Sequence, residues 1–410
     1  MDVWLIQTGE RLPLMPGIRK LRTALLAEKL AQKGHTVCWW ASAFDHFSKE
    51  WVGTKITEIE AQRGLTLKLL KGIGYKKNIS LRRYIDHRVV AWKFKHNSKL
   101  SEKPDVMVIA TPAHDIAYYA MKYAKSHDIP AIVDIRDPWP DIFLDNIPYC
   151  IKALIRLLLF NDFRMIEYVM QEATCLIAVS ETFMQWGLKY AKRQRTEKDK
   201  VFYLGYHDLP EDLERKTSPP INSLLDEIKN RFVVVYIGSF SSYHNPEILV
   251  DCAKAIDNKD IAFVLAGMGE NYEKIKKRAA GMPNVYLPGW LDQAEIEILL
   301  RHSHVGACVA PKTIDLFPNK AFLYLASGLP IISSLEGDLK ELIELEKMGY
   351  YYEPGDLDGL VNSVSRLANS HEEYNYMAYN AKKVFRERFS EDFIYDNYIN
   401  HILSVINDEN

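Results

Sequence analysis

Short apolar runs rich in β-branched residues alternate along this chain with longer stretches of helical periodicity, and the whole series occurs twice. Such alternation is typical of parallel strands joined by helical crossovers. The strand-like runs begin at Val3, Thr36, Asp105, Ala131 and Cys175 in the first series, and at Phe232, Ile261, Val285, Val305 and Leu329 in the second. The pattern predicts an α/β protein with two doubly wound, Rossmann-like domains. Because such folds bind ligands at the carboxyl ends of their strands, we expect the domains to face an interdomain cleft.

The length and one polar segment indicate where the domains divide. A chain of 410 residues exceeds the roughly 250 to 300 residues at which one hydrophobic core stops growing. Residues 206–231 hold three prolines among many charges, which favours a linker. We therefore expect an N-terminal domain over residues 1–205 and a C-terminal domain over residues 232–388. Apolar residues at helical spacing predict that residues 389–410 form a helix packing back towards the first domain.

The composition argues against several classes of protein. A formal net charge of -2 does not suit a protein that coats nucleic acid. The five cysteines are scattered without zinc or redox spacing, and His302 and His304 lack a third ligand, so no metal site is expected. The longest apolar run contains Arg156, and the first residues lack a basic region and a long apolar stretch, so we expect a cytoplasmic protein.

The stretch DLFPNKAFLYLASGLPIISS, residues 315–334, is the strongest local signal. Pro318 suits the first position of a helix, and Gly328 suits its C-terminal cap. Asn319 and Lys320 would then stand beside unpaired backbone N–H groups, an arrangement that can hold a phosphate. An ordinary capped helix with a solvated lysine explains the same residues.

A second loop follows the strand-like run at Ile261 and reads Gly267-Met268-Gly269-Glu270. A dinucleotide-binding fingerprint needs a small residue where Tyr272 stands, so the loop does not predict an NAD site. A phosphate-binding loop and a purely structural glycine turn are both compatible with it.

The segment DIRDPWPD, residues 134–141, directly follows an apolar strand-like run. At the carboxyl end of a strand, Arg136 and its neighbouring acids could contact the hydroxyl groups of a sugar, and Asp137 could stabilise positive charge at a reacting carbon. The alternative is a loop salt bridge, with Trp139 filling the core.

Two basic regions suggest anionic partners. Gly17 precedes a helix whose start carries Arg19, Lys20 and Arg22, contrary to the helix dipole, which makes sense if an anion lies there; a solvated helix face is the alternative. Residues 76–99 mix eight Lys or Arg with aromatic residues and one acid, and residues 151–169 are also amphipathic. These stretches predict contact with an anionic membrane surface, while the absence of an RNA-binding signature argues against nucleic acid.

Taken together, these segments and the runs NISLRR, LIAVSETF, VVVYIGSF and LAGMGE resemble the retaining, GT-B-fold glycosyltransferases of family four. The resemblance is greatest to the bacterial surface-polysaccharide branch that includes N-acetylfucosaminyl transferases. It implies a nucleotide sugar, usually UDP-linked, as co-substrate of the second domain, and a lipid-linked saccharide acceptor held by the first at the inner face of the plasma membrane. It implies no metal and no other cofactor.

The resemblance also implies roles for individual residues. Catalytic roles fall to Asp137, Asp315 and Lys320. Acceptor binding falls to Gly17, Arg19 and Arg136. Donor binding falls to Gly238, Ser239, Gly267, Gly269, Glu270, Pro318 and Asn319.

Two positions depart from the family pattern. The family commonly has two acids separated by seven residues, of which Asp315 matches the first and Leu323 stands in place of the second. Ser239 stands where the family usually has an arginine. These departures keep open a second interpretation, a glycosyltransferase-like partner subunit without activity. A nucleotide-sugar 2-epimerase on the same fold is a third interpretation, which leaves the basic surface unexplained.

Overall fold

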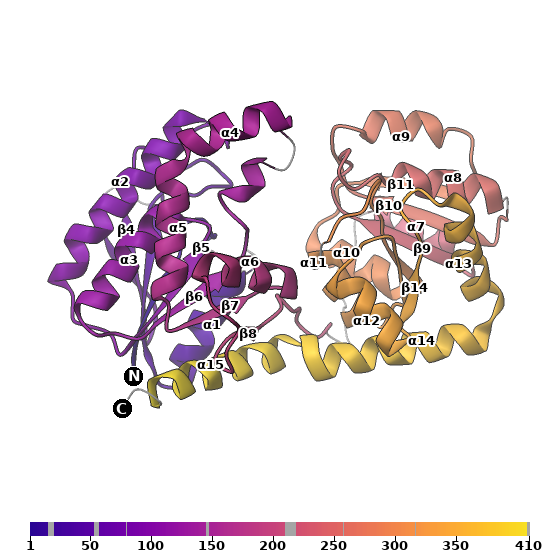
Figure 1. Cartoon of the computed structure of the whole chain (residues 1–410). Coiled ribbons are helices and arrows are strands. Elements are labelled where there is room, and N and C mark those ends of the chain that lie inside the picture. Colours follow the sequence, from indigo (N-terminus) through magenta and orange to yellow (C-terminus); the bar gives the residue numbers. More distant parts are fainter. Residues whose placement is uncertain are drawn as a thin grey trace. The chain divides into compact units, whose positions relative to one another are not determined.

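The computed structural model describes residues 1–407 apart from 15–19, 53–56, 79, 145–146, 210–218, 257 and 316. The chain forms two compact units (Figure 1). Unit 1 contains Met1–Tyr203 together with Tyr395–Asn410, and unit 2 contains Leu204–Ile394. Each unit is built on a parallel β-sheet with helices packed against it, which confirms the predicted fold class of two Rossmann-like α/β domains.

Unit 1 has an eight-stranded sheet with the order β3-β4-β2-β1-β5-β6-β7-β8, in which only β3 runs antiparallel to its neighbour. Its strands are β1 (Asp2–Ile6), β2 (Thr36–Ser42), β3 (Glu58–Gln62), β4 (Leu65–Leu70), β5 (Val106–Thr111), β6 (Ala131–Ile135), β7 (Cys175–Ala178) and β8 (Lys200–Val201). Its helices are α1 (Arg22–Gln32), α2 (Leu81–Asn97), α3 (His114–Ser126), α4 (Tyr149–Leu158), α5 (Phe160–Glu172), α6 (Glu181–Ala191) and most of α15 (Glu391–Asn407).

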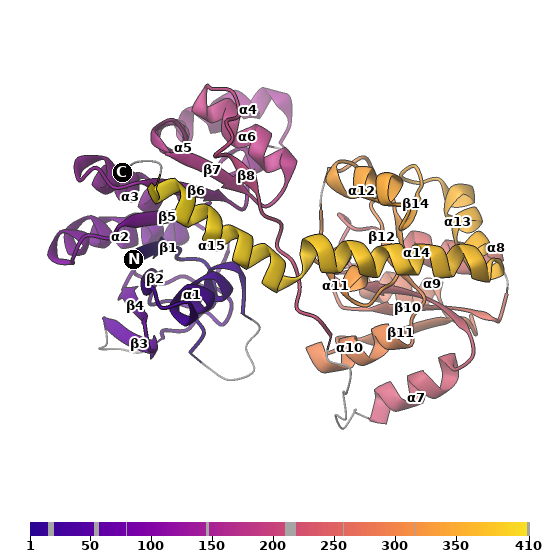
Figure 2. The same cartoon turned by 90° about the horizontal axis from the view of Figure 1, so that it is seen from below.

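Helices cover both faces of this sheet, so its central strands are buried along their whole length, as all six residues of β5 are. Helices α2, α3, α5 and α6 contribute to one apolar core, and α1 and α15 contribute to the other. Figure 2 shows α15 beside α1, where Lys33 pairs with Asp396 (3.1 Å). Tyr398 and Ile402 of α15 are fully buried in that core, so the C-terminal helix is an integral part of unit 1.

Unit 2 has a six-stranded, fully parallel sheet with the order β11-β10-β9-β12-β13-β14. Its strands are β9 (Phe232–Ile237), β10 (Ile261–Ala266), β11 (Val285–Gly289), β12 (Val305–Cys308), β13 (Ile331–Ser333) and β14 (Gly349–Tyr351). Its helices are α7 (Pro219–Ile228), α8 (Glu247–Ile256), α9 (Tyr272–Arg278), α10 (Gln293–Arg301), α11 (Asn319–Ala326), α12 (Asp338–Glu346), α13 (Leu357–Asn369) and α14 (His371–Val384).

The structure differs from the expected organisation in a few segments. Strands β3, β8 and β14 were not predicted, because their short or charged sequences lack the continuous apolar character of the central strands. Strand β4, with the sequence LTLKLL, was also not predicted, because a threonine and a lysine interrupt its leucines. The segment expected as a linker contains α7, whose Ile221 and Ile228 are buried in unit 2. Among the described helices, none has the length and apolar character needed to span a bilayer.

Candidate functional site

Two glycine-containing loops lie side by side in unit 2, at the carboxyl ends of β9 and β10. The N–H of Gly238 donates to the carbonyl of Ala266 (3.0 Å), and the N–H of Phe240 donates to the carbonyl of Met268 (3.0 Å). The loops are so close that a Cβ atom on Gly267 would lie 1.8 Å from the carbonyl oxygen of Gly238. Gly267 also has a positive φ of +146°, so only glycine fits here without strain.

The close packing of the two loops also explains the glycine at position 269. A Cβ atom at this position would lie 2.6 Å from the carbonyl oxygen of Phe240. The exposed Glu270 also links the two loops by hydrogen bonds. Its Oε1 accepts from the N–H (3.0 Å) and the hydroxyl (2.9 Å) of Ser242. These hydrogen bonds lower the pKa of Glu270. Close packing of the loops therefore accounts for both glycines and for Glu270 before any ligand is considered.

Lys320 brings a cation to the same place from the first turn of α11. Its Nζ lies 3.8 Å from the ring centroid of Tyr236 and would lie 2.8 Å from a Cβ atom on Gly238. Lys320 is only partly buried, but protein atoms crowd its ammonium, and this partial desolvation lowers its pKa to about 8. No carboxylate of the described chain forms an ion pair with it.

The groups around Lys320 are fixed by hydrogen bonds of their own. The hydroxyl of Tyr236 donates to the carbonyl of Ser239 (2.7 Å), and the N–H of Ile237 donates to the hydroxyl oxygen of Tyr324 (3.0 Å). Burial and the nearby charge of Lys320 lower the pKa of His244 to about 4, so this imidazole is neutral at pH 7. The ammonium is thus held among neutral groups.

A desolvated cation without a counterion is costly, and proteins usually pair such groups. Here the cation stands at the start of α11, where the first backbone N–H groups of the helix also favour negative charge. Pro318 is the N-cap residue and is buried, while Asn319 is exposed at the first position. Lys320, Gly238 and the start of α11 therefore form a site with the charge and the backbone geometry to hold an anion such as a phosphate.

Asp315 is exposed and pairs through a backbone bridge with Glu336. Its carboxylate lies against Gly337 at the start of α12, because a Cβ atom on that glycine would be 1.9 Å from Oδ1 of Asp315. A carboxylate at the beginning of a helix is stabilised by the helix dipole. Leu323, the residue at which this chain departs from the resembled family, is buried on α11.

Unit 1 places Arg136 in an internal ion network rather than at an open surface. Its Nη2 donates to Oδ2 of Asp134 (2.9 Å), and its Nη1 donates to Glu10 (2.7 Å). Arg22 donates to the same Asp134 from the other side (2.9 Å). Burial raises the pKa of Asp134, but the two guanidinium groups outweigh it and the net shift is downwards. The loop salt bridge considered as an alternative is therefore present, but Trp139 is only half-buried and does not fill the core.

The network also explains the basic start of α1. Both carboxylate oxygens of Glu10 accept from the helix N–H groups of Thr23 and Ala24 (3.0 Å each). The anion at this helix start is thus a side chain of the protein itself, and Lys20 pairs with Glu28 (2.7 Å). The predicted acceptor-binding residues Gly17 and Arg19 lie outside the described residues.

Asp137 follows this network and is exposed. Partial burial raises the pKa of its carboxyl group, and the neighbouring Arg136 opposes that rise. The carbonyl of Asp137 accepts from the N–H of Trp139 (2.9 Å). Its side chain is therefore accessible from solvent, in contrast to the buried Asp134 two residues earlier.

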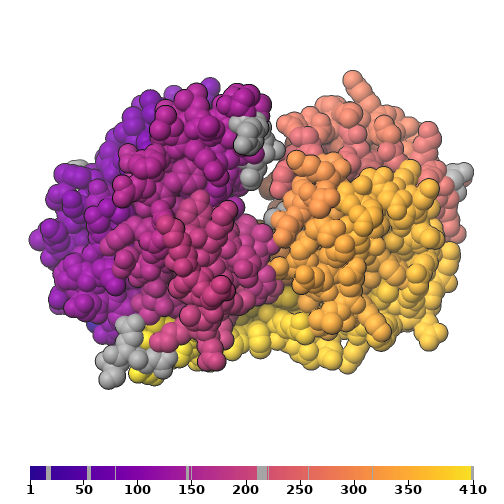
Figure 3. Space-filling view, in the orientation of Figure 1, coloured from indigo at the N-terminus to yellow at the C-terminus, as the bar shows by residue number. Residues whose placement is uncertain are grey.

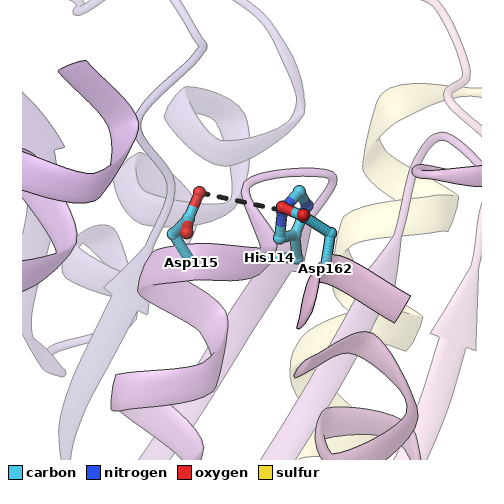
Figure 4. Close-up of side chains that lie close together, drawn as sticks. All are labelled: His114, Asp115 and Asp162. Carbon is cyan, nitrogen blue, oxygen red and sulfur yellow. Dashed lines mark hydrogen bonds and ion pairs between the residues drawn. The ribbon is translucent and has the colours of Figure 1, made fainter. Parts of the chain in front are cut away.

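A polar cluster that the sequence did not predict lies at the carboxyl end of β5. His114 begins α3, and its Nε2 lies 2.6 Å from Asp162 of α5, while Asp115 is 3.7 Å away (Figure 4). Arg88 of α2 pairs with both acids, at 2.8 Å from Asp115 and 3.1 Å from Asp162. The only sequence signal was the pair His114-Asp115 directly after a strand-like run.

The ligand atoms of His114, Asp115 and Asp162 lie within 4.8 Å of one another, which is compact enough for a metal ion. However, the guanidinium of Arg88 already supplies the positive charge between the two carboxylates. A divalent cation would have to displace Arg88 before it could bind both acids. The geometry thus favours a salt-bridge cluster that ties α2, α3 and α5 together.

Comparison with known proteins finds similar sequences and similar folds. Residues 231–370, which hold nearly all the residues of the unit 2 site, match the family model described as glycosyl transferases group 1. Sucrose-phosphate synthase from Thermosynechococcus elongatus superimposes with a TM-score of 0.73 at 14% identity, covering 99% of both chains. Anabaena HepE in complex with UDP gives a TM-score of 0.69 at 15% identity, covering 98% of this chain and 99% of that one. The chain has the GT-B fold.

Two curated relatives match only part of this chain. O-antigen chain mannosyltransferase C of Escherichia coli is 24% identical over 237 residues, which are 57% of this chain and 62% of that protein. The 2-deoxystreptamine N-acetyl-D-glucosaminyltransferase of Niallia circulans is 20% identical over 187 residues, which are 44% of this chain and 48% of that protein. The chain therefore spans less than two thirds of either relative. The likeness to N-acetylfucosaminyl transferases stays a prediction.

Proposed function

We propose that this protein is a retaining glycosyltransferase that moves a sugar from a nucleotide-sugar donor to a polyprenyl-diphosphate-linked saccharide, in surface polysaccharide synthesis at the cytoplasmic face of the plasma membrane. The donor is a UDP-linked hexose or N-acetylhexosamine. The glycosyltransferase group 1 match of residues 231–370 supports the reaction class. The names of the relatives, which include an O-antigen mannosyltransferase, and the UDP in the HepE structures support the substrates.

The observation that carries the proposal is the ammonium of Lys320, which is partly desolvated, has no ion-pair partner among the described residues and lies between a helix start and a glycine loop. In the proposed site the donor diphosphate is the missing anion, and Gly238 and the start of α11 surround it. Each charge-assisted hydrogen bond to a phosphate oxygen is worth about 1.5 to 3 kcal/mol. Because the negative charge on this diphosphate grows as the sugar leaves, the same contacts also stabilise the transition state.

The proposed chemistry needs no separate nucleophile on the protein. The acceptor hydroxyl attacks the anomeric carbon from the face that the nucleotide leaves, so the new C–O bond has the configuration of the old one. The bond from the anomeric carbon to the phosphate oxygen breaks, and the departing phosphate takes the proton of the hydroxyl. Asp315 orients the donor sugar, and the exposed Asp137 stabilises positive charge near the acceptor. No metal ion takes part, and activity in EDTA tests this point.

A direct test is transfer from a panel of UDP, GDP, TDP and CMP sugars to a lipid-linked acceptor, with thermal stabilisation by each nucleotide as a preceding screen. A ligand present at 100 times its Kd stabilises the fold by about 2.7 kcal/mol. We expect UDP sugars to stabilise the protein and Lys320→Ala to abolish turnover without loss of the fold. Full activity of that variant would remove the proposed account of the leaving group.

Leu323 and Ser239 favour a second candidate, a partner subunit that binds without turnover. Leu323 is a buried apolar residue where the related enzymes commonly have their second acid. Such a subunit would bind a nucleotide or a second transferase and would form no product with any donor. A pull-down combined with the donor panel separates the two candidates, because only the enzyme releases a free nucleotide when the acceptor is added.

A further inference from the structure

Helix α4 of unit 1 exposes the apolar side chains that a soluble amphipathic helix normally buries. Ile151 is 42% exposed, Leu154 56%, Leu157 71% and Leu158 69%, and Phe160, which follows the helix, is 53% exposed. No side chain described in α4 is buried. Figure 3 shows this segment at the surface of unit 1. A cluster of exposed leucines on one short helix is the kind of apolar patch that marks an interaction surface.

The polar residues of α4 have the charge expected for contact with an anionic surface. Lys152 and Arg156 are four residues apart, so they share one face of the helix, and the leucines occupy the adjoining arc. The helix sequence, YCIKALIRLL, contains no acidic residue. Helices of this composition lie in the interface between the headgroups and acyl chains of a bilayer.

A pocket of about 410 Å³ opens beside α4 and adds further cations. Arg156, Lys189, Phe160, Phe163 and Tyr190 are among the residues that line it. The guanidinium of Arg156 lies 5.9 Å from the ring centroid of Phe163, so its charge stands next to an apolar wall. A cationic pocket next to exposed leucines matches a phosphate headgroup and the acyl chains below it.

The acidic residues of this pocket are engaged in internal contacts. Asp141 accepts from the indole N–H of Trp186 (2.9 Å) and from the hydroxyl of Tyr190 (2.5 Å). Glu167 pairs with Lys192. Their negative charge is thus partly compensated, which leaves Arg156 and Lys189 to attract an anion.

The other predicted membrane stretch, residues 76–99, is less suited to this role. Arg82 of α2 donates to the carbonyls of Gly74 (2.7 Å) and Ile73 (3.0 Å). Arg88 is paired with the buried acids Asp115 and Asp162. Because Arg82 and Arg88 hold unit 1 together, they are not free to bind lipid headgroups, and α4 is the better candidate of the two expected stretches.

We propose that α4 docks this protein on an anionic bilayer, with its leucines at the acyl boundary and lipid phosphates against Arg156 and Lys189. The proposal rests on the proposed function only in that a lipid-linked acceptor requires the enzyme at a membrane. The docking itself involves no donor and no turnover.

Co-sedimentation with vesicles tests the docking directly. We expect the full chain to bind vesicles that contain phosphatidylglycerol more tightly than vesicles of phosphatidylcholine alone. The variant L157Q/L158Q should bind at least roughly tenfold more weakly, since it removes two leucines from the apolar face. The matched control L81Q/L100Q changes two leucines that are 74% and 87% exposed elsewhere on unit 1, and it should bind like the unchanged protein. R156Q/K189Q should lose the preference for phosphatidylglycerol.

Equal vesicle binding by L157Q/L158Q and the unchanged protein would overturn the proposal. A dimer in sedimentation velocity that L157Q/L158Q dissociates, together with unaltered vesicle binding, would assign the face to a second copy of the chain instead. UDP binding and transfer to a detergent-solubilised acceptor should be unaffected by L157Q/L158Q. If the protein binds vesicles through α4 but transfers no sugar, the docking proposal holds and only the proposed enzymatic function is refuted.

Discussion

Replacing Lys320 by methionine should make the ligand-free protein more stable and its nucleotide binding much weaker. Methionine keeps the length of the side chain and removes the charge. In the folded protein the pKa of Lys320 is about 8, below the usual 10.5, so the charged form is disfavoured by folding. Substitution of an exposed lysine that binds no ligand would change neither the free energy of unfolding nor the affinity for the nucleotide by this much.

The size of the effect follows from the pKa. The gap between 10.5 and about 8 corresponds to about 3 to 4 kcal/mol at about 1.4 kcal/mol per pKa unit. This cost is fully present below pH 8 and disappears as the pH rises from 8 to 10.5, because the unfolded chain then holds the extra proton. The substitution also removes the cation–π contact with Tyr236, worth about 0.5 to 2 kcal/mol. A net stabilisation of about 1 to 3 kcal/mol at pH 7 remains.

Urea unfolding of the ligand-free protein and calorimetric titration with UDP measure the two effects separately. Loss of one charge-assisted contact of about 1.5 to 3 kcal/mol should raise the Kd for UDP roughly 10- to 150-fold. Lys259→Met is the matched control, because Lys259 is exposed just before β10 and should alter neither quantity. A Lys320→Met protein that is less stable by 1 kcal/mol or more and binds UDP normally would refute the reasoning.

Three further predictions use the same contacts. UDP binding should weaken as the pH rises above about 8, because Lys320 then loses its proton, and calorimetry in buffers of different ionisation enthalpy should show proton uptake on binding near that pH. Gly267→Ala should destabilise unit 2 by about 2 to 4 kcal/mol in urea unfolding, from its clash with Gly238 and its positive φ, whereas Gly281→Ala, with φ +80° and open space around it, should cost only about 1 kcal/mol. Asp134→Asn should destabilise unit 1 by about 3 to 5 kcal/mol, because Arg22 is left buried without its carboxylate; a loss below 1 kcal/mol would contradict that view of the network.

Most of the fold could be predicted from hydrophobic pattern alone. Central strands such as β5 and β9 are continuous apolar runs because both faces of their sheets are covered. The edge strand β3, with the sequence EIEAQ, carries charges along an exposed side and has no such signal. Strand β14 is only three residues long, and its pairing with β13 is a long-range contact that no local pattern encodes.

The candidate site was predicted less completely, since a pattern indicates which residues are near a strand end but not which partners they find. Lys320 was identified at a helix start, yet its desolvation against Tyr236 depends on the neighbouring strand β9. Arg136 was identified next to Asp134, but its second partner, Glu10, is 126 residues away in the chain. The cluster around His114 joins three helices and required the structure.

Among the described residues, buried cations at the strand ends are paired with acids in unit 1 but not in unit 2. This difference supports the proposal that unit 2 binds the nucleotide-sugar donor. In unit 1, Arg22 and Arg136 are balanced by Asp134 and Glu10, so the network is electrically neutral and can stabilise the fold without a ligand. In unit 2, the ammonium of Lys320 has only neutral neighbours among the described residues and retains an uncompensated charge. An uncompensated charge lowers the stability of the free protein. The charge of Lys320 is therefore best explained by an anionic ligand that neutralises it on binding. Unit 2 is therefore the place where we expect the nucleotide diphosphate.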